Sequence, residues 1–179
     1  MVNLKAKPFN LTDEDIKWVE ATIADMTIEE KIGQLFVNMG ASREEEYLKD
    51  MLNTYHIGAV RYNPATAEQV YDQNKILQEN SKIPLLIAAN TEAGGNGACV
   101  NGTHVASQVK IGATNDPKYA YEMGRVSGVE AAAIGCNWSF APVVDIDMNW
   151  RNPVISTRCY SNKAEQVLEY SLEYMRGIM

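Results

Sequence analysis

Two apolar stretches, residues 83–89 (IPLLIAA) and residues 140–146 (FAPVVDI), decide the fold. The first is apolar throughout and the second is apolar at most positions, which is typical of strands that are buried on both faces. Two further short apolar runs, residues 35–39 and 57–62, come before them in the chain. We therefore predict four strands of a parallel sheet.

Helix-start signals surround these apolar runs. Thr12 can cap a helix, and Asp116 followed by Pro117 is a typical first turn. Three capping boxes are predicted, each pairing a polar cap with a Glu three residues later: Thr27 with Glu30, Ser42 with Glu45 and Asn162 with Glu165. The predicted helices cover, approximately, residues 13–26, 28–35, 43–55, 68–80, 117–134 and 163–179.

The alternation of strands and helices predicts an α/β fold. We expect a helical lead-in over residues 1–34 and about four βα units over residues 35–179. An open sheet and half of an eight-stranded barrel both fit this alternation. In either fold the functional edge lies at the carboxyl ends of the strands. The long polar loops 90–110 and 147–161 are expected there.

Composition narrows the class of protein. The chain has 179 residues, of which 46% are hydrophobic and 22% charged, as in ordinary globular domains. Its net charge of −7, without a basic stripe, argues against nucleic-acid and membrane partners. The first residues lack the apolar run of a signal peptide, so we expect a cytoplasmic protein. Three widely spaced cysteines predict neither a disulfide framework nor a metal site, and no cofactor is expected.

Four segments in order give the chain a family resemblance. They are MTIEEKIGQLF (26–36), IPLLIAANTEAGG (83–95), WSFAPVVDIDMNWRNPVIS (138–156) and TRCYS (157–161). Together they resemble the N-terminal domain of glycoside hydrolase family 3, which includes β-glucosidases and β-N-acetylhexosaminidases. The resemblance covers nearly the whole chain. It implies that residues 1–179 are the N-terminal portion of a TIM-like (β/α)8 barrel.

The resemblance also implies an activity, the retaining hydrolysis of a β-linked glycoside by two carboxyl groups. The family's nucleophile is an Asp on a later strand, and its acid/base lies later still. A Lys-His pair also follows the fourth unit in the family. None of these groups occurs in this chain, so the resemblance implies no catalytic residue here and no turnover by the chain alone.

Three residues are the expected substrate-binding residues. Arg158 matches the family's sugar-binding Arg, and Asn90 stands where the family has an Asp that accepts hydrogen bonds from sugar hydroxyls. An amide accepts less strongly than a carboxylate and adds a donor. Glu92 is the candidate to replace that carboxylate. Each also has a structural interpretation: a solvated loop arginine, a turn residue and a capping carboxylate.

Other residues have competing interpretations. Asp145 and Asp147 share one face of a strand and can flank a ligand, but the resemblance favours a role in ending the strand. The two histidines, His56 and His104, lack partners at metal-ligand spacing. Cys159 stands beside Arg158, which can lower the pKa of a thiol, but no second catalytic group accompanies it.

Three functions remain open. The chain is part of a glycosidase, or a non-catalytic half barrel that binds sugar, or an α/β domain that binds a phosphorylated small molecule through the glycines of AGGNG (93–97). The sequence EAGG (92–95) resembles the hexosaminidase branch more than the glucosidase branch. A half barrel leaves sheet edges unpaired, so self-association is also expected.

Overall fold

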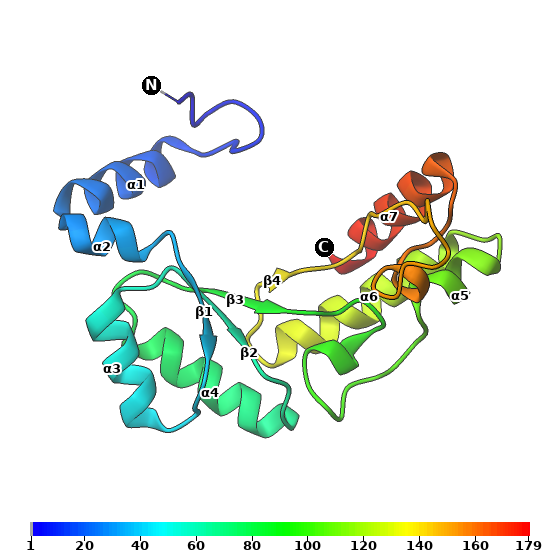
Figure 1. The fold of residues 1–179 in the computed structure, drawn as a ribbon. Coiled ribbons are helices and arrows are strands. Elements are labelled where there is room, and N and C mark those ends of the chain that lie inside the picture. Colours follow the sequence, from blue (N-terminus) through cyan, green and yellow to red (C-terminus); the bar gives the residue numbers. More distant parts are fainter. Residues whose placement is uncertain (1) are drawn as a thin grey trace.

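The computed structural model describes residues 2–179, which form an α/β structure around one parallel sheet (Figure 1). The strands are β1 (Val37–Gly40), β2 (Ala59–Tyr62), β3 (Leu86–Ala89) and β4 (Trp138–Ser139). They pair side by side in the order in which they occur in the chain. This order is that of successive strands in a (β/α)8 barrel, so the predicted fold class is confirmed.

Helices precede the sheet and connect its strands. They are α1 (Asp13–Asp25), α2 (Ile28–Gly33), α3 (Glu45–Tyr55), α4 (Ala67–Asn80), α5 (Gln108–Ala113), α6 (Lys118–Ala133) and α7 (Ala164–Ile178), with 3-10 turns η1 (Gly95–Gly97) and η2 (Ser156–Arg158). Figure 1 shows α3 and α4 against one side of the sheet, while α5, α6 and α7 gather beyond the carboxyl end of β3. Helix α5 was not among the predicted helices, and it begins within residues 90–110, which we predicted to be a loop.

The helix-start predictions meet mixed outcomes. The cap at Thr12 and the capping box at Thr27 are both present, and each side-chain oxygen accepts from the backbone three residues later. The predicted boxes at Ser42 and Asn162 are wrong, because α3 begins after Glu44 and α7 after Lys163, without side-chain caps. Local turns account for both differences: Ser42 Oγ accepts from the Glu44 amide and Ser161 Oγ accepts from the Lys163 amide.

The fourth strand is not where the apolar run predicted it. Strand β4 covers Trp138–Ser139, and the ladder to β3 ends when the Phe140 amide donates to the Ala89 carbonyl at 3.0 Å. Pro142 follows, and proline has no N–H with which to continue a ladder. Val143 pairs with a side chain instead. Its amide donates to Gln108 Oε1, and its carbonyl accepts from Gln108 Nε2, both at 2.9 Å.

The buried core lies on one side of the sheet and continues between the later helices. The first cluster joins the sheet to α3 and α4, with Val60, Leu77 and Ile87 fully buried. The second joins α5, α6 and α7 around Tyr170 and Tyr174. Burial of these apolar side chains is the main favourable contribution to the folded state.

The opposite face of the sheet is open within residues 2–179. Strand register places Val37, Leu86 and Trp138 on this face, which we call the inner face, and they are 44%, 49% and 37% exposed. The prediction that the strands are buried on both faces is therefore not met in this part of the chain. No helix among the described residues is long and apolar enough to span a membrane.

Candidate functional site

The three expected binding residues lie at the carboxyl ends of the strands. Asn90 and Glu92 directly follow β3, and Arg158 ends the 3-10 turn η2 in the long loop after β4. The loop brings Arg158 to Glu92 across 66 residues of sequence. These positions make up what we call the strand-end site.

Arg158 and Glu92 form a bidentate ion pair. Arg158 Nε donates to Glu92 Oε2 and Nη2 donates to Oε1, each at 2.8 Å. The pair is partly open to solvent, with 43% of the Arg158 side chain and 20% of the Glu92 side chain exposed. The hydrogen bonds that Arg158 donates to Glu92, and then the charges of Glu92 and Asp145, raise the pKa of Arg158. Two parallel bonds fix the plane of the guanidinium as well as its position.

Asn90 contacts a residue that the sequence did not indicate. Arg61, on β2, donates from Nε to Asn90 Oδ1 at 3.4 Å. A guanidinium has donors only, so the amide oxygen must face it and the amide NH₂ must face away. Strand register pairs Arg61 with Ala88 on the inner face, two residues before Asn90. Arg61 was missed because one basic residue in an apolar run carries no motif.

A buried hydroxyl network holds the segment between Asn90 and Glu92. Thr91 is fully buried, and its Oγ1 lies 2.8 Å from Ser139 Oγ and 2.9 Å from the Tyr174 hydroxyl. Tyr174 also donates to the Thr91 carbonyl at 2.8 Å, and Ser127 Oγ donates to the same carbonyl at 3.2 Å. Helices α6 and α7 therefore fix the end of β3. Sequence reasoning did not find this network.

The glycine-rich loop is tightly packed and uses its own backbone donors. The amides of Gly94, Asn96, Gly97, Ala98 and Cys99 all donate to carbonyls within residues 91–103. A phosphate cradle needs such N–H groups free to face the ligand. The loop therefore does not support the phosphate interpretation. A Cβ atom at Gly97 would lie 1.7 Å from the Asn90 carbonyl oxygen, so the loop packs tightly against the backbone of the strand-end site.

The two aspartates of the fourth segment do not form a metal site. Asp145 is exposed and Asp147 is half-buried, and the Asp147 amide donates to the Ser161 carbonyl at 3.1 Å. Within residues 2–179, no group of three or more His, Cys, Asp or Glu side chains is arranged to hold a metal ion. His56 caps α3 in a left-handed conformation, and His104 forms a backbone bridge with Gly94.

The cysteines are buried and unreactive by environment. Burial raises the pKa of the thiols of Cys99, Cys136 and Cys159. For Cys159 the charge of Asp147 adds to the effect of burial, and both raise the pKa. The suggestion that Arg158 lowers the pKa of this thiol is therefore wrong.

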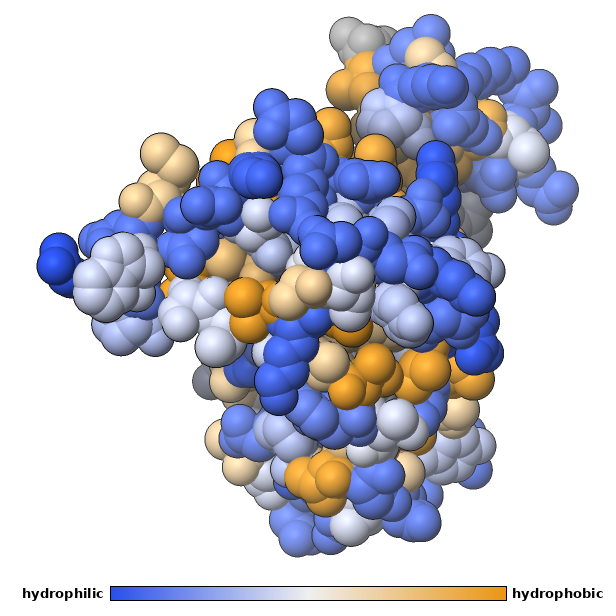
Figure 2. All heavy atoms as spheres, turned by 90° about the vertical axis from the view of Figure 1, so that its right-hand side faces the viewer, coloured by the Kyte–Doolittle hydropathy of each residue, from blue (hydrophilic) through white to orange (hydrophobic). Residues whose placement is uncertain are grey.

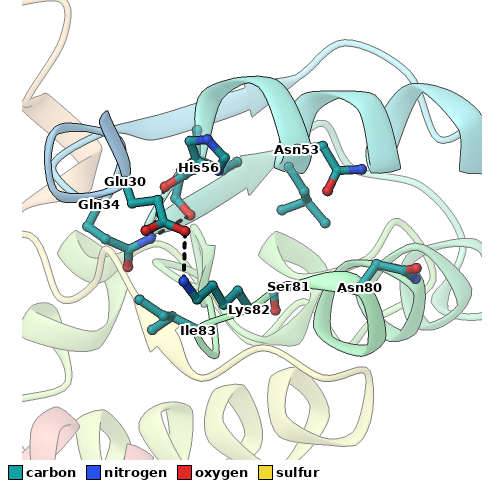
Figure 3. A pocket seen from close by; sticks show the side chains of 10 residues that line it. Glu30, Gln34, Asn53, His56, Asn80, Ser81, Lys82 and Ile83 are labelled. Atoms are coloured by element: carbon teal, nitrogen blue, oxygen red, sulfur yellow. Dashed lines mark hydrogen bonds and ion pairs between the residues drawn. The ribbon is translucent and has the colours of Figure 1, made fainter. Parts of the chain in front are cut away.

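A hollow lies at the opposite end of the sheet from the strand-end site. It measures about 200 Å³ and is lined by the carboxyl ends of α2, α3 and α4 (Figure 3). An ion pair from Lys82 Nζ to Glu30 Oε1, 2.9 Å long, stands at this hollow, and Gln34 Nε2 donates to the His56 carbonyl. In αβ barrels this end of the strands serves stability, and the chemistry takes place at the other end.

Apolar side chains also reach the outer surface. Figure 2 views the molecule from the side of α5, α6 and α7 and shows apolar groups breaking an otherwise hydrophilic surface. Exposed apolar residues on these helices and on the loop after β4 include Val109, Val129, Leu168, Leu172, Met175, Phe140, Val144, Ile146, Met148, Trp150 and Val154.

Comparison with known proteins identifies relatives of this architecture. Residues 27–179 match the family described as the glycosyl hydrolase family 3 N terminal domain. A beta-N-acetylglucosaminidase/beta-glucosidase from Cellulomonas fimi is 39% identical over 178 residues, which cover 99% of this chain and 32% of that protein.

Solved structures agree with the sequence comparison. A beta-glucoside phosphorylase, BglX, superposes with a TM-score of 0.90 and 38% identity over 98% of this chain and 32% of that one. A family 3 beta-N-acetylglucosaminidase from Paenibacillus sp. str. FPU-7 gives a TM-score of 0.76 with 32% identity, covering 86% of this chain and 31% of that one. The chain thus spans about a third of the length of these relatives.

Proposed function

Because the chain belongs to the glycosyl hydrolase family 3 N-terminal domain family, we propose that it supplies a sugar-binding surface of a retaining β-glycosidase. The single observation that carries this proposal is the strand-end site. A fixed Arg158–Glu92 pair stands beside Asn90, at the edge of the sheet where barrels bind their substrates. The substrate class is a β-linked glycoside.

Each residue has a role that follows from its donors and acceptors. Arg158 donates to a ring hydroxyl from the nitrogen that Glu92 leaves free, and Glu92 accepts from a neighbouring hydroxyl. Asn90 contributes its NH₂ group. Charged partners make hydrogen bonds that are about twice as strong as neutral ones, so the pair provides most of the affinity.

We assign the reacting carboxyl groups to segments outside this chain. Retaining hydrolysis needs a carboxylate nucleophile and a carboxylic acid about 5 Å apart, on either side of the glycosidic bond. Glu92 is committed to Arg158 and does not suit the role of a free nucleophile. The 179-residue chain alone is therefore expected to bind sugar without turning it over.

Binding tests this proposal directly. Saturation-transfer NMR would measure the affinity of the chain for methyl β-D-glucoside and for methyl N-acetyl-β-D-glucosaminide. The variant Arg158→Ala should lose most of the signal, whereas Arg125→Ala should not, since Arg125 is a surface residue of α6 paired with Glu122. No saturable binding of either sugar to the wild-type chain would contradict the proposal.

A second candidate reaction is phosphorolysis. The observation that favours it is the superposition, at a TM-score of 0.90, on a protein named as a beta-glucoside phosphorylase. There phosphate, in place of water, would accept the glycosyl group. A fusion of this chain to the remaining part of the Cellulomonas fimi relative would separate the two reactions. Hydrolysis releases free sugar at any phosphate concentration, and phosphorolysis releases a sugar 1-phosphate only when phosphate is present.

We also propose that the isolated chain self-associates. Strands β1 and β4 end the sheet, and the inner face carries exposed apolar side chains. Unpaired strand edges offer free N–H and C=O groups to another chain.

A further inference from the structure

Arg61 is a guanidinium whose charge is not neutralised by any ion pair within residues 2–179. Its side-chain hydrogen bonds to the described residues go to the Asn90 amide oxygen at 3.4 Å and to the Met39 sulfur at 3.1 Å. Both are neutral, and a thioether is a weak acceptor. A guanidinium has five N–H donors, so most of its hydrogen-bonding capacity is unused.

The surroundings make this unused capacity unusual for a cation. Arg61 is half-buried on the inner face, next to Met39 and Ala88 in strand register. A charge that leaves water is stable only when it finds a counter-charge or good hydrogen bonds. Among the described residues Arg61 has no counter-charge, and its side-chain hydrogen bonds go to a neutral amide oxygen and to a weakly accepting sulfur.

Arg158, the arginine of the strand-end site, differs from Arg61 in this respect. Arg158 is neutralised by Glu92 and lies within the field of Asp145. The nearby carboxylates therefore offset the charge of Arg158, and the positive charge of Arg61 remains uncompensated by the described residues. The amide NH₂ of Asn90 faces away from Arg61, so it adds further donors beside that charge.

We propose that Arg61 and Asn90 together bind an oxyanion in the strand-end site. The guanidinium supplies the charge and the amide supplies neutral donors, a combination that suits a phosphate or a carboxylate. This proposal rests on the sugar-binding function, because the site is the same. It adds a preference for a negatively charged group, which Arg158 and Glu92 do not imply.

The oxyanion has two chemical sources. A free phosphate would bind beside a neutral sugar, as phosphorolysis requires. Alternatively, a carboxylate carried by the sugar itself, as in a β-glucuronide, would occupy the same position. The two sources share the chemistry of the site and differ in whether sugar and phosphate bind together or compete.

The test is a titration of inorganic phosphate into the 179-residue chain, followed by ³¹P NMR. We expect saturable binding that Arg61→Met weakens about tenfold or more, because a charge-assisted contact is lost. Arg61→Lys should retain part of the affinity and Arg125→Met all of it. Far-UV circular dichroism would check that each variant is folded. The absence of saturable binding to the wild type, or equal binding by folded Arg61→Met, would overturn the proposal.

Two further arms identify the source and separate this proposal from the proposed function. If the anion is free phosphate, methyl β-D-glucoside binds in its presence without competition. If it is a sugar carboxylate, methyl β-D-glucuronide binds more tightly than the glucoside and phosphate displaces it. Phosphate binding without any glycoside binding would support Arg61 and contradict the sugar-binding function. Glycoside binding without any anion preference would do the reverse.

Discussion

Arg158 and Glu92 hold one another through two parallel hydrogen bonds of 2.8 Å, although they are 66 positions apart in the sequence. The pair couples the loop after β4 to the end of β3. Neither charge is free, so a ligand must share existing partners. Each residue therefore fixes the orientation of the other, and both shape the surface that a sugar meets.

Arg158→Ala should weaken glycoside binding by about 1.5–3 kcal/mol, the range for a hydrogen bond to a charged group. Arg158→Lys should recover little of this, because an ammonium cannot form two parallel bonds. Isothermal titration with a substrate-like inhibitor would measure both variants. An affinity that Arg158→Ala leaves unchanged would return this arginine to the solvated-loop interpretation.

Tyr174→Phe should lower the free energy of unfolding by about 1–3 kcal/mol. The change removes the Tyr174 hydroxyl, so that the buried hydroxyl and the carbonyl of Thr91 each lose one hydrogen-bond partner. Urea denaturation would measure the loss. Tyr119→Phe is the matched control, since Tyr119 is a half-exposed residue of α6. Equal stability of the two variants would show that the hydroxyl network contributes nothing.

Gly97→Ala should be strongly destabilising, by roughly 2 kcal/mol or more, because its Cβ would meet the Asn90 carbonyl oxygen at 1.7 Å. The clash also displaces Asn90, so glycoside binding should weaken. Gly40→Ala is a control with no atom within 4 Å of the added Cβ. Thermal unfolding of both variants would check this, and a Gly97→Ala midpoint equal to that of Gly40→Ala would refute the close approach.

Acid should destabilise the chain partly through Glu30. The hydrogen bond from Lys82, followed by that from the Thr27 amide, lowers the pKa of Glu30. A carboxyl whose folded pKa is lowered stabilises the protein above its unfolded pKa, about 4.3, and this contribution is lost as the pH falls through the folded pKa. Urea unfolding across that range should therefore show a shallower pH dependence for Glu30→Gln. An unchanged slope would count against this contribution.

Self-association should be visible by sedimentation at micromolar concentration. The open edges of β1 and β4 and the exposed inner face favour pairing of two copies. Val37→Lys places a charge on an edge strand and should shift the distribution towards monomer. A wild-type chain that sediments as a monomer and unfolds cooperatively would contradict this expectation.

The sequence predicted those features that depend on neighbouring residues. The cap at Thr12 and the box at Thr27 were found because cap and partner lie three residues apart. The boxes at Ser42 and Asn162 failed because a serine just before each helix offers the backbone a competing turn.

Contacts between residues that are far apart in the sequence could not be predicted from local patterns. Thr91 and Tyr174 are 83 residues apart, and nothing in either neighbourhood indicates that their hydroxyls meet. In the sequence Arg61 only interrupts an apolar strand, and its place near Asn90 emerges when the register pairs it with Ala88, two residues before Asn90. The fourth strand was misplaced because hydrophobicity continued past the point where Pro142 stops the ladder.

The pairing of Val143 with the Gln108 side chain has a consequence for how this domain can change during evolution. Gln108, the first residue of α5 in the connection that follows β3, acts as the strand partner of one residue of the loop after β4. An insertion or deletion between Asn90 and Gln108 would move the amide away from Val143 and detach the segment that leads towards Arg158. The two loops therefore cannot diversify independently. Homologues that lack a glutamine at this position should also differ in the length or course of the segment after Pro142.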